Sequence, residues 1–169
     1  MVETDRLIII PLDYRQLRLY IYCNKKLEKE LRISRTVRMV SSQVRDRTEY
    51  LTLPEMKKAE RDHYLFFTFW LVIEKSSRNI VAELGFKGAP NNDGEVELGY
   101  GTFFGYRRKG FMTEAVKGMI EWAGKRDDIC YILAETDESN SGSIKVMQKN
   151  NFKNFDRKEK MLWWKIAVK

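Results

Sequence analysis

The sequence contains one histidine, two cysteines and three prolines among its 169 residues. A single histidine excludes any site that needs two histidine ligands, and His63 lies in a polar stretch where we expect it to be solvated. Cys23 and Cys130 show neither metal-ligand nor CxxC spacing, so we interpret both as free thiols. We therefore expect no metal site.

Long apolar runs are also missing. No run approaches the length that spans a bilayer, and the first ten residues, MVETDRLIII, carry acid where a signal peptide carries base. No repeat, low-complexity segment or Pro/Gly linker divides the chain. We expect one domain over residues 1–169, located in the cytoplasm and without a membrane partner.

The charge balance favours anionic partners. The formal net charge is +7, and nucleic acid, ribosomal particles and phosphorylated cofactors all fit such a balance. The charges are interleaved along the chain rather than gathered in a tail. Charge alone therefore does not choose among these partners.

The order of the predicted elements is that of an α+β protein. Three consecutive strands predict an antiparallel meander, and the later helices and strands predict a mixed sheet with one βαβ crossover. Ser41 and Ser42 resemble a helix N-cap region, and Pro54 is expected to break or restart the last of the early helices. The expected elements are a strand at 6–12, helical segments between 13 and 60, strands at 65–75, 80–88 and 95–104, a helix at 110–125, a strand at 130–136, a helix at 141–150 and a final strand pair around 156–160.

The stretch GYRRKGFMTEA, residues 105–115, places a basic turn at the start of a helix. An apolar stripe at helical spacing follows it, consisting of Met112, Ala115, Val116, Met119, Ile120 and Ala123. The first amides of such a helix have no intrahelical partner, and the helix dipole is positive there. Arg107, Arg108 and Lys109 add charge, and Gly110 lets the backbone approach a ligand closely. The turn therefore suits an anion.

Two nucleotide motifs do not fit this turn. A P-loop needs Lys and Ser/Thr after its second glycine, where Phe111 and Met112 stand, and Gly99-x-Gly101 lies too far before the helix for a dinucleotide fingerprint. A solvated basic turn remains the alternative to an anion site.

Four segments together resemble the GNAT N-acetyltransferases, most closely their RimJ/RimL-like branch. Residues 107–112, RRKGFM, resemble the acetyl-CoA-binding pattern Q/R-x-x-G-x-G/A. ETDRLIIIPL, VELGYGTF and residues 135–152 resemble, in the right order, the opening, the fourth strand and the xNxxSxxxxxxxGF segment of that branch. The resemblance covers nearly the whole chain and implies a mixed, mostly antiparallel sheet of about seven strands with helices on both faces.

Two residues depart from the family pattern. Met112 replaces the small residue that closes the acetyl-CoA motif, although it also fits the apolar stripe of the helix. Asn151 replaces the glycine before Phe152, and asparagine is the next-best residue for a left-handed helix end. Neither change removes a chemically active side chain.

The resemblance implies a bound acetyl-CoA as co-substrate, with its pyrophosphate on the amides from Arg108 to Thr113. It also implies that Asn140 bonds to the pantetheine arm or the loop beside it. The implied cofactor-binding residues are Arg107, Arg108, Lys109, Gly110, Phe111, Met112, Thr113 and Asn140. The implied reaction is direct acetyl transfer to a primary amine in a ternary complex.

Glu97 is the candidate base. In EVELGYG, Val96, Leu98 and Tyr100 alternate onto one strand face, while Glu97 shares the other face with two glycines. The glycines make a notch in which a substrate can approach the backbone, and the family places its proposed base at this glutamate. An ordinary carboxylate is a weak base for an ammonium group, so a more basic carboxyl, a water relay or mere substrate positioning all stay open.

Ser143 matches the position proposed in this branch to protonate the departing thiolate. A serine in the first turn of a helix is also common capping chemistry. Many members of the family use a tyrosine after the fifth strand instead, but Tyr131 opens that strand and comes too early to be its counterpart. The identity of the acid stays open.

The acceptor is expected over the first helices, at residues 24–45, where Lys, Arg and Glu are frequent. A protein N-terminus and a small-molecule amine both remain open, as does a monomer or a homodimer. Two rival functions are a GNAT-fold module that binds CoA without catalysis and a basic nucleic-acid-binding domain. The aromatic residues fall in strands that are expected to be buried, which argues against nucleic acid.

Overall fold

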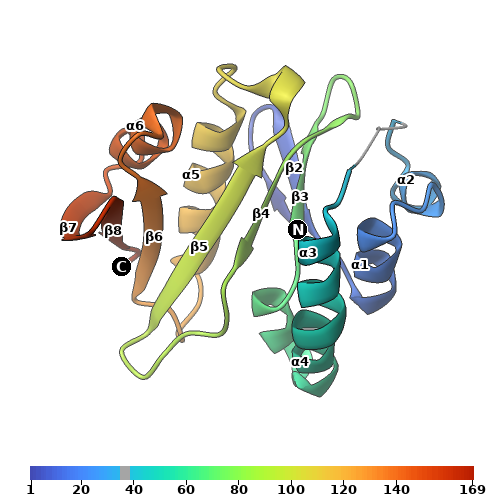
Figure 1. Cartoon of the computed structure of the whole chain (residues 1–169), viewed down its shortest axis with the longest axis horizontal. Helices are drawn as coiled ribbons and strands as arrows, with labels where there is room; N and C mark the ends of the chain where they lie inside the picture. Colours follow the sequence, from blue (N-terminus) through green and yellow to red (C-terminus); the bar gives the residue numbers. More distant parts are fainter. Residues whose placement is uncertain (35–38) are drawn as a thin grey trace.

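The computed structural model describes residues 1–34 and 39–169. In this part of the chain, eight strands form one sheet, and helices pack against both of its faces (Figure 1). The strands are β1 (Val2–Glu3), β2 (Leu7–Pro11), β3 (Trp70–Glu74), β4 (Ile80–Phe86), β5 (Glu95–Thr102), β6 (Tyr131–Asp137), β7 (Lys153–Lys158) and β8 (Met161–Ala167).

The helices fall into an early group and two later ones. The early group is α1 (Tyr14–Ile21), α2 (Lys26–Leu31), α3 (Ser42–Arg47) and α4 (Leu53–Lys58), and the later helices are α5 (Phe111–Ala123) and α6 (Ser141–Lys149). A π-helical turn, η1 (Thr48–Thr52), joins α3 to α4, and two 3-10 helices are η2 (Arg61–Phe66) and η3 (Phe104–Tyr106).

The sheet is mixed and mostly antiparallel, as expected. The strand order is β1-β2-β3-β4-β5-β6-β8-β7, and every neighbouring pair is antiparallel except β5 and β6. α5 forms the crossover between these two parallel strands. The strand beyond the expected seven is β1, a two-residue strand that pairs with β2.

The two central strands, β5 and β6, pair over only a short length. Glu95, Val96 and Glu97 of β5 pair with residues 131–133 of β6, and the pairing ends there. β5 then continues to Thr102 beside β4, while β6 continues beside β8. The strands therefore diverge in the middle of the sheet, and we call the space between them the wedge (Figure 1).

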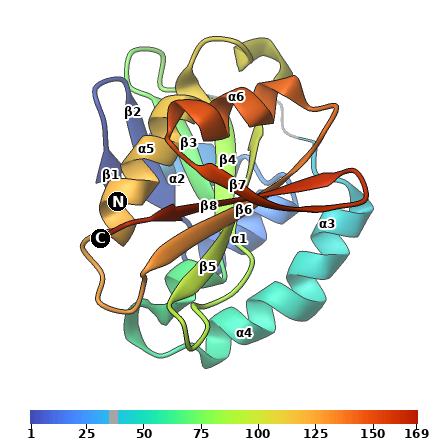
Figure 2. The same ribbon diagram turned by 90° about the vertical axis from the view of Figure 1, so that its left-hand side faces the viewer.

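The sheet separates two hydrophobic cores. One core lies between the sheet and α5, where Trp70, Leu98 and Met119 are buried together. The other lies under the early helices, where Leu17 of α1 and Leu71 of β3 are fully buried. Figure 2 shows α5 and α6 on the side of the sheet away from α4. One face of the central strands thus meets α5, and the other meets the early helices.

Several local expectations are confirmed. Ser41 caps α3, because its hydroxyl accepts from Val44 N at 3.2 Å. Pro54 lies in the first turn of α4, where a missing N–H is tolerated, so it restarts the helix after the π-helical turn. Met112 is buried in the core under α5. Asn151 adopts the left-handed conformation, with φ of 61°, after α6.

The predicted strand at 65–75 is wrong in its first part. Residues 61–66 form the 3-10 helix η2, and the strand begins only at Trp70. The Thr68 hydroxyl donates to the Leu12 carbonyl at 2.7 Å, and Phe66 is buried in the core. The high frequency of aromatic residues in this segment indicates that it is buried, but it does not show that the backbone is extended.

The helical stretch expected between 13 and 60 is confirmed for the described residues, whereas residues 35–38 of the expected acceptor surface lie outside them. Within the described residues, the helices are too short or too polar to cross a membrane.

Candidate active site

The basic turn leads into a helix start without a side-chain cap. Gly110 is the N-cap of α5 and adopts a left-handed conformation with φ of 80°, and it offers no side chain to the first amides. Gly110 is exposed, as are Arg107, Arg108 and Lys109 before it. The first N–H groups of α5 therefore point into a solvent-facing, positively charged turn, which is the arrangement that binds anions.

The side chains around this turn are either apolar and buried or charged and exposed. Phe111 and Met112 are buried in the core, so only their backbone N–H groups face a ligand. Arg107 donates to the Thr102 carbonyl at 3.3 Å, which holds the turn against the end of β5. Lys109 Nζ lies 5.3 Å from the centroid of the Tyr106 ring. All three cations of the turn are exposed, and Arg107 and Lys109 are also held by contacts within it.

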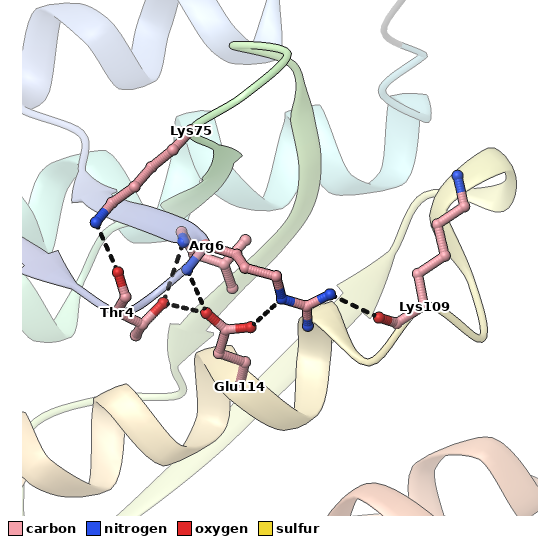
Figure 3. A network of polar contacts seen from close by, with 6 residues as sticks. Thr4, Arg6, Lys75, Lys109 and Glu114 are labelled. Carbon is pink, nitrogen blue, oxygen red and sulfur yellow. Dashed lines mark hydrogen bonds and ion pairs between the residues drawn. The ribbon is translucent and has the colours of Figure 1, made fainter.

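A second anchor of the turn comes from the loop between β1 and β2. Arg6 Nε donates to Glu114 Oε2 at 2.7 Å, and its Nη1 donates to the Lys109 carbonyl at 3.2 Å (Figure 3). The guanidinium also lies over the Phe111 ring, 4.9 Å from its centroid. Arg6 thus binds the residues on both sides of Gly110.

Glu114, on the first turns of α5, accepts the hydrogen bonds by which the loop between β1 and β2 holds the turn. Its Oε1 accepts from the Thr4 hydroxyl at 2.6 Å and from the Arg6 backbone N–H at 2.8 Å. Partial burial opposes ionisation, but the hydrogen bonds from Thr4 and Arg6 and the Arg6 charge outweigh it and lower the pKa of Glu114. The sequence reasoning assigned no role to these residues, although they lie in the ETDRL and MTEA segments of the family resemblance.

Glu97 lies where β5 and β6 part. It is the last β5 residue that pairs with β6, opposite Leu133, and it faces away from the core under α5. The alternation expected from EVELGYG is therefore present. Glu97 stands at the closed end of the wedge, next to the part of β5 that no longer pairs with β6.

A lysine that the sequence reasoning missed lies next to Glu97. Lys87 Nζ is 2.5 Å from Glu97 Oε1 and 2.5 Å from Glu135 Oε1 on β6, so one ammonium bridges two carboxylates. Partial burial opposes its charge, but both carboxylates raise the pKa of Lys87. Glu97 Oε1 is inaccessible to solvent, and the Lys87 ammonium is its partner.

The start of α6 is tied to β5. Asn140 is the N-cap of α6, and its Oδ1 accepts from Ser143 N at 3.1 Å. The Tyr100 hydroxyl donates to the Ser143 carbonyl at 3.3 Å, and burial raises the pKa of Tyr100 to about 12. Ser143 is therefore held beside the strand that carries Glu97.

The candidate residues form two groups rather than one. Asn150, at the far end of α6, donates to the Thr113 carbonyl of α5 at 3.2 Å. Asn140 caps the opposite end of this helix of nine residues, which is about 14 Å long at the usual helical rise. The basic turn and the Asn140 cap therefore lie at different ends of α6. In the described part of the chain, no three His, Cys, Asp or Glu side chains gather as a metal site.

Comparison with known proteins connects this arrangement to one family. A family model described as an acetyltransferase (GNAT) domain matches residues 6–153. The chain is 36% identical over 86 residues to the uncharacterized N-acetyltransferase YjdG of Bacillus subtilis (strain 168), and this match covers 51% of each protein. The matched part is thus about half the length of that curated relative.

Two solved structures share the fold over nearly their whole length. The ribosomal-protein-S5-alanine acetyltransferase from Vibrio fischeri has a TM-score of 0.70 at 17% identity, with 98% of this chain and 95% of that chain covered. RimL, a ribosomal L7/L12 alpha-N-protein acetyltransferase solved in complex with coenzyme A, has a TM-score of 0.66 at 14% identity, with 97% of this chain and 95% of that chain covered. At these identities the likeness concerns the fold.

Proposed function

The chain belongs to the GNAT acetyltransferase family, and we propose that it is an enzyme that moves an acetyl group from acetyl-CoA to a primary amine. The uncapped start of α5 behind an exposed basic turn carries this proposal. Acetyl-CoA supplies an acetyl group activated as a thioester. The residues fit such a molecule, because an exposed helix N-terminus and the exposed cations Arg108 and Lys109 suit its phosphates.

We assign phosphate binding to the backbone amides of residues 108–113, with charge from Arg108 and Lys109. Arg6 and Glu114 fix the turn from the other side, because they bind the Lys109 carbonyl and the first turns of α5. Asn140 holds the start of α6 in place as its N-cap. In this proposal, Asn140 acts on the pantetheine arm through the loop that it orders.

We assign the proton of the attacking amine to Glu97. An amine must lose a proton to attack a thioester, and a carboxylate beside an exposed backbone can accept it directly or through one water molecule. Lys87 holds Glu97 and Glu135 together and offsets one of their two negative charges. Ser143 is assigned the relay of a proton from solvent water to the departing thiolate, so that its hydroxyl gains one proton as it gives one up, while Glu97 releases the amine proton to solvent. Tyr100 holds the Ser143 backbone beside β5.

Thermal unfolding with and without acetyl-CoA tests the binding step. Ligand at a hundredfold excess over its dissociation constant adds about 2.7 kcal/mol, which corresponds to a shift of roughly 5 to 11 °C for a domain of this size. We expect this shift in the wild type, its loss in the Arg108→Glu/Gly110→Asp double variant, and its retention in Lys117→Glu. Lys117 is an exposed cation on the same helix, away from its start.

Release of free thiol in the presence of an amine library tests the transfer step. We expect turnover in the wild type and a loss of at least about a hundredfold in Glu97→Gln, as for removal of a general base. A thermal shift without turnover for any amine would indicate a CoA-binding module without catalysis. No shift in a folded wild type would contradict the proposal, and salt-dependent affinity for an oligonucleotide would then support nucleic-acid binding.

A further inference from the structure

Lys87 places a primary amine at the candidate base. Its backbone N–H donates to the Glu97 carbonyl at 2.9 Å, which fixes Lys87 opposite Glu97 just after the end of β4. Its side chain runs beside Gly99, where a Cβ would lie 3.9 Å from Lys87 Cε. The ammonium ends 2.5 Å from Glu97 Oε1, an oxygen that is inaccessible to solvent. Among residues 1–34 and 39–169, this is the amine that contacts Glu97.

The same ammonium spans the point where β5 and β6 part. Glu97 and Leu133 form the last pair between these strands, and Glu135 lies two residues further along β6. Lys87 Nζ is 2.5 Å from a carboxylate oxygen of each glutamate, so it lies at the closed end of the wedge. The Lys87 side chain is 39% exposed, so it is open to a molecule that enters the site.

The proposed function asks for an amine nitrogen in this position. The nitrogen that attacks the thioester must contact Glu97 directly or through one water molecule, and an acceptor has to bring that nitrogen from outside. Lys87 Nζ already makes the contact. Partial burial opposes its charge, but both carboxylates raise the pKa of Lys87, so only a small fraction is uncharged near neutral pH. Reaction at Lys87 is therefore expected to be slow.

We propose that Lys87 is a self-acetylation site, to which the protein transfers the acetyl group of acetyl-CoA when no acceptor amine is present. This inference rests on the proposed function, because it uses the same base and the same co-substrate. The ammonium loses one proton to Glu97, which releases it to solvent. Nζ then bonds to the acetyl carbon, the carbon–sulfur bond breaks, and the second proton leaves the nitrogen as the thiolate sulfur gains one. The products are Nε-acetyl-Lys87, coenzyme A with a free thiol, and one proton.

Self-acetylation removes a charge from the site. Nε-acetyl-Lys87 is neutral, so Glu97 and Glu135 lose the cation that lies between them in the unmodified protein. The modified protein should therefore turn over acceptor amines more slowly. An acceptor that takes the acetyl group first protects Lys87. Self-acetylation thus lowers activity when acetyl-CoA is abundant and the acceptor is scarce.

Lys165 of β8 is a matched internal control. It pairs with Leu133, the β6 partner of Glu97, and therefore lies on the same sheet face. Its ammonium is 2.6 Å from Glu95 of β5, and its side chain is 32% exposed, which is close to the value for Lys87. Of the two lysines, Lys87 is the one that contacts the candidate base. General chemical acetylation should modify both, whereas transfer through Glu97 should favour Lys87.

Peptide mass spectrometry of the full-length protein tests the inference. The protein is incubated with acetyl-CoA without an amine, and acetylation of Lys87 and Lys165 is followed over time. We expect Lys87 to be acetylated at least about tenfold faster than Lys165. The rate constant should not depend on protein concentration, as for a step within one molecule. Equal rates at the two lysines would overturn the inference.

The variant Glu97→Gln distinguishes a base from an ion-pair partner. If Glu97 only pairs with Lys87, its loss lowers the pKa of Lys87 and speeds chemical acetylation. If Glu97 accepts the proton, its loss slows acetylation of Lys87. We expect slowing of at least about tenfold, with no change in the control Glu95→Gln, which removes the partner of Lys165 instead. Unchanged or faster acetylation in Glu97→Gln would contradict the assignment.

A mixture of two variants tests whether the transfer stays within one molecule. Lys87→Arg retains Glu97, and Glu97→Gln retains Lys87, so neither protein holds both groups. We expect Lys87 to remain unmodified in the mixture beyond its rate in Glu97→Gln alone. Faster acetylation in the mixture would show transfer between molecules and would overturn the inference.

Two further outcomes separate this inference from the proposed function. If acetyl-CoA shifts the melting temperature and the wild type acetylates an added amine, but Lys87 stays unmodified, the self-acetylation site is wrong and the enzyme assignment stands. If acetyl-CoA gives no shift in the folded wild type, both are wrong.

Discussion

Lys87 occupies an unusual position for a lysine, because its ammonium lies between two carboxylates on neighbouring strands. Glu97 is 10 residues away along the chain, whereas Glu135 is 48 residues away, so only the sheet brings the three together. Both carboxylates are partly buried, and the lysine is the cation between them. The candidate base is therefore held by a residue outside its own strand.

Replacing Lys87 by methionine should expose this dependence. Two carboxylates would face each other without a cation, so we expect a loss of about 1 kcal/mol in the free energy of unfolding and a clear fall in kcat. Urea denaturation and initial rates measure the two effects. The double variant Lys87→Met/Glu135→Gln returns the net charge of the group to its wild-type value and should recover part of the lost stability. Wild-type kcat in Lys87→Met would contradict the role of the bridge.

Glu114 should make the protein acid-sensitive. The pKa of Glu114 is lowered in the folded state, so ionised Glu114 stabilises the folded protein. This contribution to the free energy of unfolding is fully present when the pH lies above the usual pKa range of glutamate, and it is lost as the pH falls through the lowered pKa. Glu114→Gln should cost about 1 kcal/mol at pH 7, and this difference from the wild type should shrink steadily below about pH 5. Urea midpoints at pH 7, 5 and 4 measure it. A difference independent of pH would refute the assignment.

At the scale of elements, Gly110 links the basic turn to α5. An alanine there would have to adopt φ near 80°, and its Cβ would lie 3.4 Å from Arg6 Nη2. We expect Gly110→Ala to cost roughly 1–2 kcal/mol and to reduce the thermal shift with acetyl-CoA. Gly110→Asn should cost less, because asparagine tolerates the left-handed region. Equal stability of Ala, Asn and Gly at this position would show that the turn relaxes.

The elements differ in how far the sequence predicts them. The helix expected at 110–125 is found at Phe111–Ala123, because six apolar residues at helical spacing all face one core. The two faces of β5 also follow from simple alternation. The strand predicted at 65–75 was wrong over residues 65–69, since composition indicates burial but does not distinguish a 3-10 helix from a strand.

The candidate site was predictable only where its residues are local in sequence. The basic turn and Glu97 each lie in one short motif. Arg6 and Lys109 are 103 residues apart, and Lys87 and Glu135 are 48 apart, so their contacts exist only once the sheet has formed. Pairings of this kind depend on strand order and register, which no local pattern contains.

At the scale of the whole molecule, the net charge of +7 should strengthen the binding of an anionic ligand. Raising the ionic strength from about 0.1 M to about 1 M shortens the screening length from about 10 Å to about 3 Å. We expect the dissociation constant of acetyl-CoA to rise at least about threefold over this range, with a smaller rise in Arg108→Gln. Isothermal titration calorimetry measures both. Identical salt dependence in the two proteins would place the attraction elsewhere on the surface.

Because β5 and β6 diverge after three residue pairs, each of them has an inner edge that faces the other strand without pairing with it. An outer strand edge offers unpaired backbone groups to any passing chain and so invites aggregation. This inner edge has a neighbour on both sides and is closed at one end by the three residue pairs that join β5 to β6. Beyond Glu97 and Leu133 the two strands no longer pair with each other. A ligand that lies between them and carries amides of its own would therefore complete the interrupted ladder.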